Sequence, residues 1–254
     1  MNATSTVGTV EWTQHTGGRL EPAERRRLVG DLARVHARNV VGRFSVLAHL
    51  DHGRRSCVPP ARLLPPDTPL TRAAQDAAAG VLPATLVNHS YRTYRFATAL
   101  GELEGLEVDT EVLFAAALLH DTGLVLARGK DDFTLTSARV AQDVAEQVGL
   151  SAPATKTLQT AITMHHSPHV PLAAGPVAYL LSAGAGVDVV GMRRWDLPPS
   201  ILAQAVRDHP REGFKAYFTR AWATEAARVP QGRAQLLRRY GAFTAAIALA
   251  PFDE

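Results

Sequence analysis

The sequence predicts an all-α protein, a helical bundle with an N-terminal helical extension and additional C-terminal helices. Apolar residues recur at helical spacing along most of the chain, as Leu28, Leu32 and Val35 illustrate. Prolines and glycines fall where these periodic segments end, as Pro83 and Gly149 do. No segment sustains the alternation of a strand, and 254 residues suffice for one large domain or a domain with an extension.

The first expected helix runs from about residue 21 to residue 48. It opens with Glu21-Pro22-Ala23-Glu24, because proline suits the first turn of a helix. The segment from Asp51 to Asp67 contains four prolines and is predicted to be an irregular linker. We therefore divide the chain into residues 1–65, a helical extension with its linker, and residues 66–254, the main domain with the C-terminal helices.

The central helices carry the polar residues of interest. Thr68-Pro69-Leu70-Thr71 resembles a helix start, and an amphipathic helix is expected over residues 86–103. Asp109 can cap the next helix, whose apolar run ends at His120, and Gly123 then opens a loop. Further helices are expected over residues 136–148, 151–166, 176–190, 213–228 and 233–248, with one more starting at residue 198.

Composition narrows the classes of function. The 27 basic and 24 acidic residues are interspersed, and the short arginine clusters contain no aromatic residues, so no nucleic acid is expected as a partner. Cys57 is the only cysteine, which excludes an internal disulfide and a cysteine-rich zinc site. The N-terminus lacks the features of a signal peptide, and the apolar stretch near residues 177–190 is too short and too polar to span a bilayer. We expect a cytoplasmic protein that does not bind membranes.

The pair His120-Asp121 stands at the end of a strongly apolar run from Val112 to Leu119. Removing an imidazole and a carboxylate from water there is unfavourable unless another group uses them. A divalent metal is such a group, because it keeps the carboxylate ionised and the imidazole neutral. A satisfied polar pair at a helix end is the alternative interpretation.

Two further residues can complete a metal site. His89 lies near the start of the helix over residues 86–103, and Asp188 lies late in the helix over residues 176–190. Taken singly, His89 could be a surface histidine, and Asp188 could pair with Arg193. Taken together, they predict one divalent ion bound by His89, His120, Asp121 and Asp188. Mixed nitrogen and oxygen ligands suit zinc, our first choice, or iron, manganese or nickel.

The order histidine, histidine-aspartate, aspartate resembles the signature of the HD superfamily of metal-dependent enzymes. Short sequence motifs over about residues 66 to 190 resemble those of its cyanamide hydratase-like branch. These motifs are Pro66-Asp67-Thr68-Pro69-Leu70, Asn88-His89-Ser90-Tyr91-Arg92-Thr93-Tyr94, Ala117-Leu118-Leu119-His120-Asp121-Thr122-Gly123 and Ala161-Ile162-Thr163-Met164-His165. The resemblance implies an HD-type catalytic domain within residues 66–254 and a single zinc that activates water for addition to a nitrile carbon.

The residues after the pair favour one metal ion over two. The 5′-nucleotidase branch of the superfamily has a glutamate, and the dinuclear phosphodiesterases a lysine, where this chain has Leu124. No histidine lies between Thr122 and Met164 to bind a second ion. The chain also departs from the cyanamide hydratase-like branch near Thr134, where that branch carries an acidic residue.

Three clustered histidines are candidates for roles beside the metal. His165 resembles a family histidine at the end of a helix, and it could donate a proton or anchor the substrate. Asp121 could also accept a hydrogen bond from the metal-bound water. At most two of His165, His166 and His169 can face one pocket, and His166 is a second candidate for substrate binding.

Two residues near His89 are also candidates for substrate binding. Asn88 precedes His89, and Arg92 follows it by three positions, so Arg92 could look toward the same side of the helix. Our preferred interpretation of Arg92 is nevertheless a surface residue that pairs with Glu102 or Glu104.

Three functions remain open at this point. We expect a metal-dependent hydratase (lyase) or hydrolase that acts on a carbon–nitrogen bond of a small substrate, such as cyanamide, a nitrile or an amide. The second function is hydrolysis of a nucleotide or small phosphate ester, with Arg92 holding the phosphate. The third is a metal-stabilised binding protein without enzymatic activity, whose site would be sealed from solvent. The first and last helices could pair between subunits of a homo-oligomer.

Overall fold

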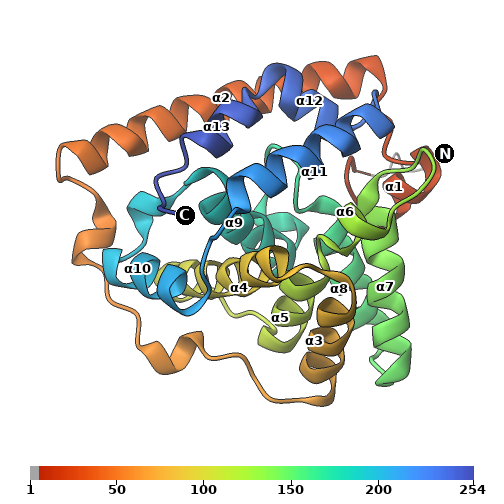
Figure 1. Ribbon diagram of the computed structural model, residues 1–254, viewed down its shortest axis with the longest axis horizontal. Helices are drawn as coiled ribbons and strands as arrows, with labels where there is room; N and C mark the ends of the chain where they lie inside the picture. Colours follow the sequence, from red (N-terminus) through yellow and green to blue (C-terminus); the bar gives the residue numbers. More distant parts are fainter. Residues whose placement is uncertain (1–5) are drawn as a thin grey trace.

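Helices α4 (Ala84–Glu104) and α9 (Pro176–Val190) lie side by side in the middle of the protein (Figure 1). The structure is a computed structural model, and it describes residues 6–254. The two helices approach closely at Gly184, where an added Cβ would lie 2.3 Å from the backbone oxygen of Thr93. Because only glycine fits this contact, Gly184 sets the separation between the two helices.

The other helices pack around this pair. Helix α5 (Thr110–Leu119) is buried from Val112 to Leu119 and contacts α4, α3, α7, α8 and α9. The remaining helices are α1 (Val10–Thr16), α2 (Pro22–Leu47), α3 (Pro69–Val81), α6 (Thr122–Leu126), α7 (Phe133–Gln147), α8 (Ala152–Met164), α10 (Pro199–Asp208), α11 (Phe214–Arg228), α12 (Arg233–Tyr240) and α13 (Phe243–Ala248). Short 3-10 turns are η1 (His52–Arg55), η2 (Pro60–Leu63), η3 (Leu172–Ala174) and η4 (Arg194–Asp196). The expected all-α fold is confirmed, since residues 6–254 contain no strand.

The long helix α2 crosses one side of the molecule beside α12 (Figure 1). It buries only a narrow stripe that includes Leu28 and Leu32, whereas Phe44 and Leu47 are exposed on its outer side. Its N-terminal end is tied to the segment before α12, because the Leu20 amide donates a hydrogen bond of 3.0 Å to the Gln231 carbonyl. An isolated β-bridge between Arg19 and Gly232 lies next to this bond.

Several element boundaries differ from those expected. The loop predicted after Gly123 begins instead with the short helix α6. Helix α7 starts three residues earlier than expected, because the Asp132 side chain caps it by accepting a hydrogen bond of 3.0 Å from the Thr134 amide. The helix predicted over residues 233–248 breaks into α12 and α13 at Ala242, whose φ is 46°. Helix α1 was not predicted.

The hydrophobic core continues across the predicted domain boundary at residue 65. Trp12, Leu20 and Leu28 belong to the same cluster of buried residues as the apolar run of α5. A shared core does not by itself decide whether the two parts are separate domains, so the division at residue 65 stays a prediction. In residues 6–254, no helix combines the length and the hydropathy needed to cross a membrane.

Candidate metal centre

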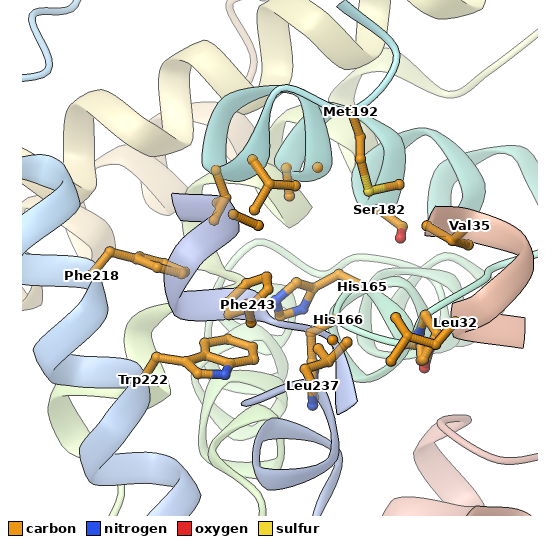
Figure 2. A pocket seen from close by; sticks show the side chains of 18 of the residues that line it. Leu32, Val35, His165, His166, Ser182, Met192, Phe218, Trp222, Leu237 and Phe243 are labelled. Atoms are coloured by element: carbon orange, nitrogen blue, oxygen red, sulfur yellow. The ribbon is translucent and has the colours of Figure 1, made fainter. Parts of the chain in front are cut away.

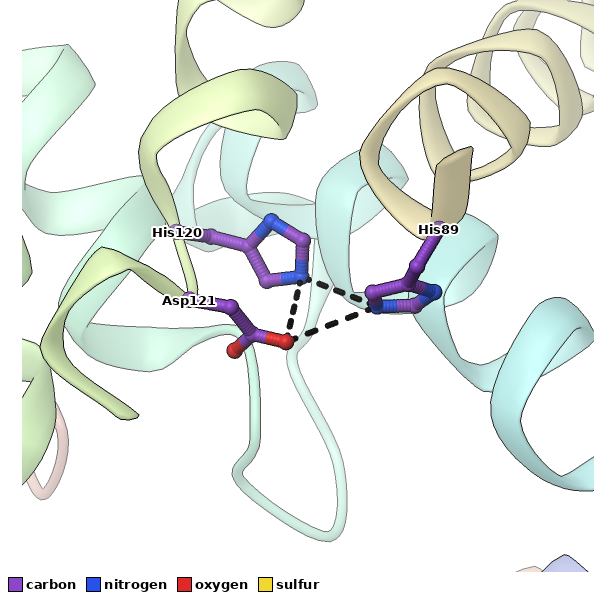
Figure 3. Close-up of side chains that lie close together, drawn as sticks. All are labelled: His89, His120 and Asp121. Carbon is purple, nitrogen blue, oxygen red and sulfur yellow. Dashed lines mark hydrogen bonds and ion pairs between the residues drawn. The ribbon is translucent and has the colours of Figure 1, made fainter. Parts of the chain in front are cut away.

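The side chains of His89, His120 and Asp121 meet at one point between α4 and the junction of α5 and α6 (Figure 3). The two Nε2 atoms of the histidines lie 3.2 Å apart. Oδ2 of Asp121 lies 3.4 Å from Nε2 of His120 and 3.6 Å from Nε2 of His89. All three side chains are about 1% exposed, so water does not solvate them freely.

The hydrogen bonds on the far side of each imidazole indicate which atoms face the cluster. Nδ1 of His120 lies 2.8 Å from the Ala117 carbonyl, and Nδ1 of His89 lies 2.7 Å from the Asp188 carboxylate. Both acceptors take a hydrogen bond from Nδ1, so the Nε2 atom of each ring faces the cluster and is the atom placed to bind a metal. Both carboxylate oxygens of Asp121 are buried without a hydrogen-bond donor among the described residues.

A buried carboxylate without a hydrogen-bond donor is unfavourable unless a cation lies beside it. Burial lowers the pKa of His120 to about 3, so its imidazole is neutral at physiological pH and available as a ligand. Two imidazole nitrogens and one carboxylate oxygen are a donor set that suits zinc and other divalent transition metals. The residues present therefore fit one divalent ion, and three protein ligands leave further coordination positions for water.

A break between α5 and α6 lets the consecutive residues His120 and Asp121 both face the candidate metal site. Helix α5 ends at Leu119, and Asp121 is the first residue outside α6, so the chain turns between the two ligands. The Thr122 hydroxyl stabilises the turn by donating a hydrogen bond of 2.8 Å to the Leu119 carbonyl. At Gly123 an added Cβ would lie 1.9 Å from the Phe133 carbonyl oxygen, so only glycine lets α6 pack this closely on α7.

Asp188 lies behind His89 and outside the three-residue cluster. Its carboxylate accepts hydrogen bonds of 2.8 Å from Nε and Nη2 of Arg92, and it also accepts one from Arg211. Burial opposes ionisation of Asp188, but the guanidinium groups of Arg92 and Arg211 hold its pKa well below the usual range. The hydrogen bond from Nδ1 of His89 to Asp188 orients the imidazole, and the expectation that Asp188 is a fourth metal ligand stays a prediction.

The expected positions of Arg92 and Asn88 are not observed. Arg92 is fully buried, so the predicted surface pairing with Glu102 or Glu104 is wrong. Its Nη1 donates to the carbonyls of His209 and Pro210, and the guanidinium does not face the cluster. Asn88 donates a hydrogen bond of 3.0 Å to the Pro210 carbonyl, away from the cluster.

Of the three clustered histidines, His165 lies nearest to the metal ligands. Its Nε2 is 3.6 Å from Oδ1 of Asp121, while its Nδ1 donates a hydrogen bond of 2.7 Å to the Ile162 carbonyl. His166 is also buried, and its Nε2 lies 3.4 Å from Asp132. His169 is exposed and is not among the residues that line the space beside the cluster. The structure thus brings His165 and His166, but not His169, toward the site.

Comparison with known protein families agrees with this geometry. The family model described as the HD domain matches residues 86–212, half of the chain. The chain belongs to the HD domain family. The matched residues include the histidine, the histidine-aspartate pair and the later aspartate, and the family indicates a metal-dependent function of the hydrolase type. No curated protein matches the sequence.

A pocket of the HD domain opens onto the cluster of His89, His120 and Asp121. It holds about 840 Å³ of space, including its opening to solvent, and reaches His89, His120 and Asp121. His165 and His166 also line it, as Figure 2 shows. No lysine or arginine occurs among the described residues that line this pocket.

Sequence reasoning missed the residues that surround the HD domain site from outside the matched segment. Helix α2 contributes Leu32 and Val35 to the pocket, although nothing in its pattern distinguishes pocket residues from ordinary core residues. The role of Arg211 was also missed. Only the fold brings it to Asp188, which lies 23 positions earlier in the chain.

Proposed function

We propose that the protein is a mononuclear metal-dependent enzyme that hydrates or hydrolyses a carbon–nitrogen bond of a small neutral substrate, such as cyanamide, a nitrile or an amide. The observation that carries this proposal is a pocket without lysine or arginine that opens on His89, His120 and Asp121. Away from the metal site, the described lining of the pocket offers no lysine or arginine that could pair with an anionic substrate, which favours a neutral substrate.

The ligands of the proposed ion are His89, His120 and Asp121. A divalent ion bound there, zinc first and iron, manganese or nickel as alternatives, would supply an acidified water and polarise the substrate. Asp188 acts in this proposal as a positioning residue, since it keeps the proton of His89 on Nδ1.

His165 is the residue placed to move a proton. When the oxygen of water adds to the substrate carbon, one proton of that water must reach the substrate nitrogen. Nε2 of His165 lies beside Oδ1 of Asp121, and its Nδ1 proton is held by the Ile162 carbonyl. Nε2 is therefore free to take the proton from the water and deliver it to nitrogen, with Asp121 orienting that water.

The two alternative functions have less support. Phosphate ester hydrolysis would benefit from a cationic side chain in the pocket, but Arg92 and Arg211 both bind Asp188. A purely structural metal would be sealed from solvent, but the pocket reaches all three proposed ligands.

The test compares Asp121→Ala with Asp143→Ala, a substitution at an exposed residue of α7. Metal content is measured by mass spectrometry, and turnover is measured on cyanamide, nitriles, amides and phosphate esters. We expect Asp121→Ala to lose both bound metal and turnover of the carbon–nitrogen substrates, and Asp143→Ala to keep both. Full metal content and unchanged turnover in Asp121→Ala would refute the site, and phosphate release as the main activity would refute the reaction class.

A further inference from the structure

The wall of the pocket next to the metal cluster is aromatic. Phe218 is 3% exposed, and its ring meets that of His89 edge-on with centroids 5.7 Å apart. Trp222 stacks on Phe218 at 5.7 Å, and Phe243 lies 4.7 Å from Trp222. A continuous aromatic surface thus extends outward from a metal ligand.

The polar edge of this surface is turned away from the pocket. Nε1 of Trp222 donates a hydrogen bond of 3.2 Å to the Ala234 carbonyl, so the indole has no free donor to offer a ligand. Figure 2 shows Phe218 and Trp222 on one side of His165, with Val35 and Met192 on the other side. A molecule that reaches His165 therefore passes between an aromatic wall and a second wall in which Ser182 lies among apolar side chains.

The aromatic wall and Val35 come from outside the segment that the family model matches, whereas Met192 lies within it. Phe218 and Trp222 belong to α11, Phe243 belongs to α13, and Val35 belongs to α2. All of them lie before residue 86 or after residue 212. The aromatic wall of this pocket is therefore supplied by the flanking helices of this chain, outside the shared metal-binding segment.

We infer that the substrate carries an uncharged aromatic or branched aliphatic body, which Phe218, Trp222 and Phe243 bind while its carbon–nitrogen group meets the metal cluster. The identity of the reacting group rests on the proposed function, whereas the apolar body rests on the pocket alone. A substrate as small as cyanamide would leave both walls in contact with water, which apolar surfaces disfavour.

The test measures binding to the metal-loaded protein by calorimetry, independently of turnover. The ligands are benzonitrile, acetonitrile and 4-cyanobenzenesulfonate, which share a nitrile and differ in the body and its charge. We expect benzonitrile to bind at least tenfold more tightly than acetonitrile, because each buried methylene-sized group contributes about fourfold in affinity. The sulfonate should bind at least tenfold more weakly than benzonitrile, since no lysine or arginine among the described residues lines the pocket to pair with its charge.

Two matched phenylalanine variants then test whether the apolar body of the ligand contacts the aromatic wall. Phe243→Ala removes the outer, partly buried ring of the wall, and Phe44→Ala removes a ring that is 67% exposed on α2. We expect Phe243→Ala to weaken benzonitrile about tenfold without changing acetonitrile, and Phe44→Ala to change neither. Equal affinities for benzonitrile and acetonitrile in the wild type would overturn the inference, and so would unchanged benzonitrile binding in a folded Phe243→Ala variant.

The outcomes separate this inference from the proposed function. Tight, wall-dependent binding of aromatic nitriles and amides without any turnover would support the pocket inference and refute the proposed reaction. Turnover of cyanamide or acetonitrile that shows no preference for an apolar body would refute the inference and leave the proposed reaction standing.

Discussion

Replacing Asp188 by asparagine should weaken both the fold and the metal site. The carboxylate accepts hydrogen bonds from Arg92, Arg211 and His89, and both arginines are at most 1% exposed. Asp188→Asn removes the carboxylate charge with which both buried arginines form ion pairs. Breaking a buried ion pair by removing one partner lowers the free energy of unfolding by about 3–5 kcal/mol. The orientation of His89 would also be lost, which should weaken metal binding by about 10–100-fold.

The assay uses urea unfolding of the metal-free protein together with a chelator competition for the metal. Asp208→Asn is the matched control, because Asp208 also pairs with an arginine, Arg95, but its side chain is 42% exposed. That substitution should change the free energy of unfolding by at most about 1 kcal/mol. Equal effects of the two substitutions would refute the argument from burial. A loss of metal affinity well beyond about 100-fold for Asp188→Asn would instead return Asp188 to the set of direct ligands.

Three further predictions follow from the packing and the charges. Gly184→Ala should lower the free energy of unfolding by about 1–3 kcal/mol in urea, because its Cβ meets the α4 backbone, whereas Gly80→Ala, with open space around it, should raise it by about 0.5–1 kcal/mol. Burial and the Arg233 cation lower the pKa of His166 to about 4, so the unfolded chain binds a proton that the folded protein does not. The free energy of unfolding should therefore fall as pH decreases from about 6.5 toward 4. In urea unfolding, His166→Gln should reduce this pH dependence. Chelation of bound metal should lower the melting temperature, and added zinc should restore it, with a gain of about 2.7 kcal/mol at a free metal concentration 100 times the Kd; an unchanged melting temperature would argue against the site.

The sequence predicted the three candidate metal ligands better than the residues that surround them. His89, His120 and Asp121 were found because a short motif and an apolar helix identify them locally. Arg92 was wrongly placed at the surface, because helical spacing does not reveal that it forms an ion pair with Asp188 of another helix.

The helices were mostly predicted from their caps and their periodicity. The range expected for α9, residues 176–190, agrees with the structure, since proline opens it and Gly191 closes it. The break at Ala242 was missed, because an alanine gives no sign of a left-handed backbone. The pocket walls could not be predicted either, since apolar residues of α2 and α11 resemble any other core residues until the tertiary structure is known.

Helix α2 spans the pocket between two fixed points. Its start is held by the backbone bond between Leu20 and Gln231, and its far end is held where Arg43 donates a hydrogen bond of 3.2 Å to the Val190 carbonyl. Leu32 and Val35 lie between these anchors and line the pocket. The helix is thus a fixed rim and not a hinged lid. Ligand association should therefore follow a single kinetic phase whose rate rises linearly with ligand concentration, without the plateau that a slow closing step imposes.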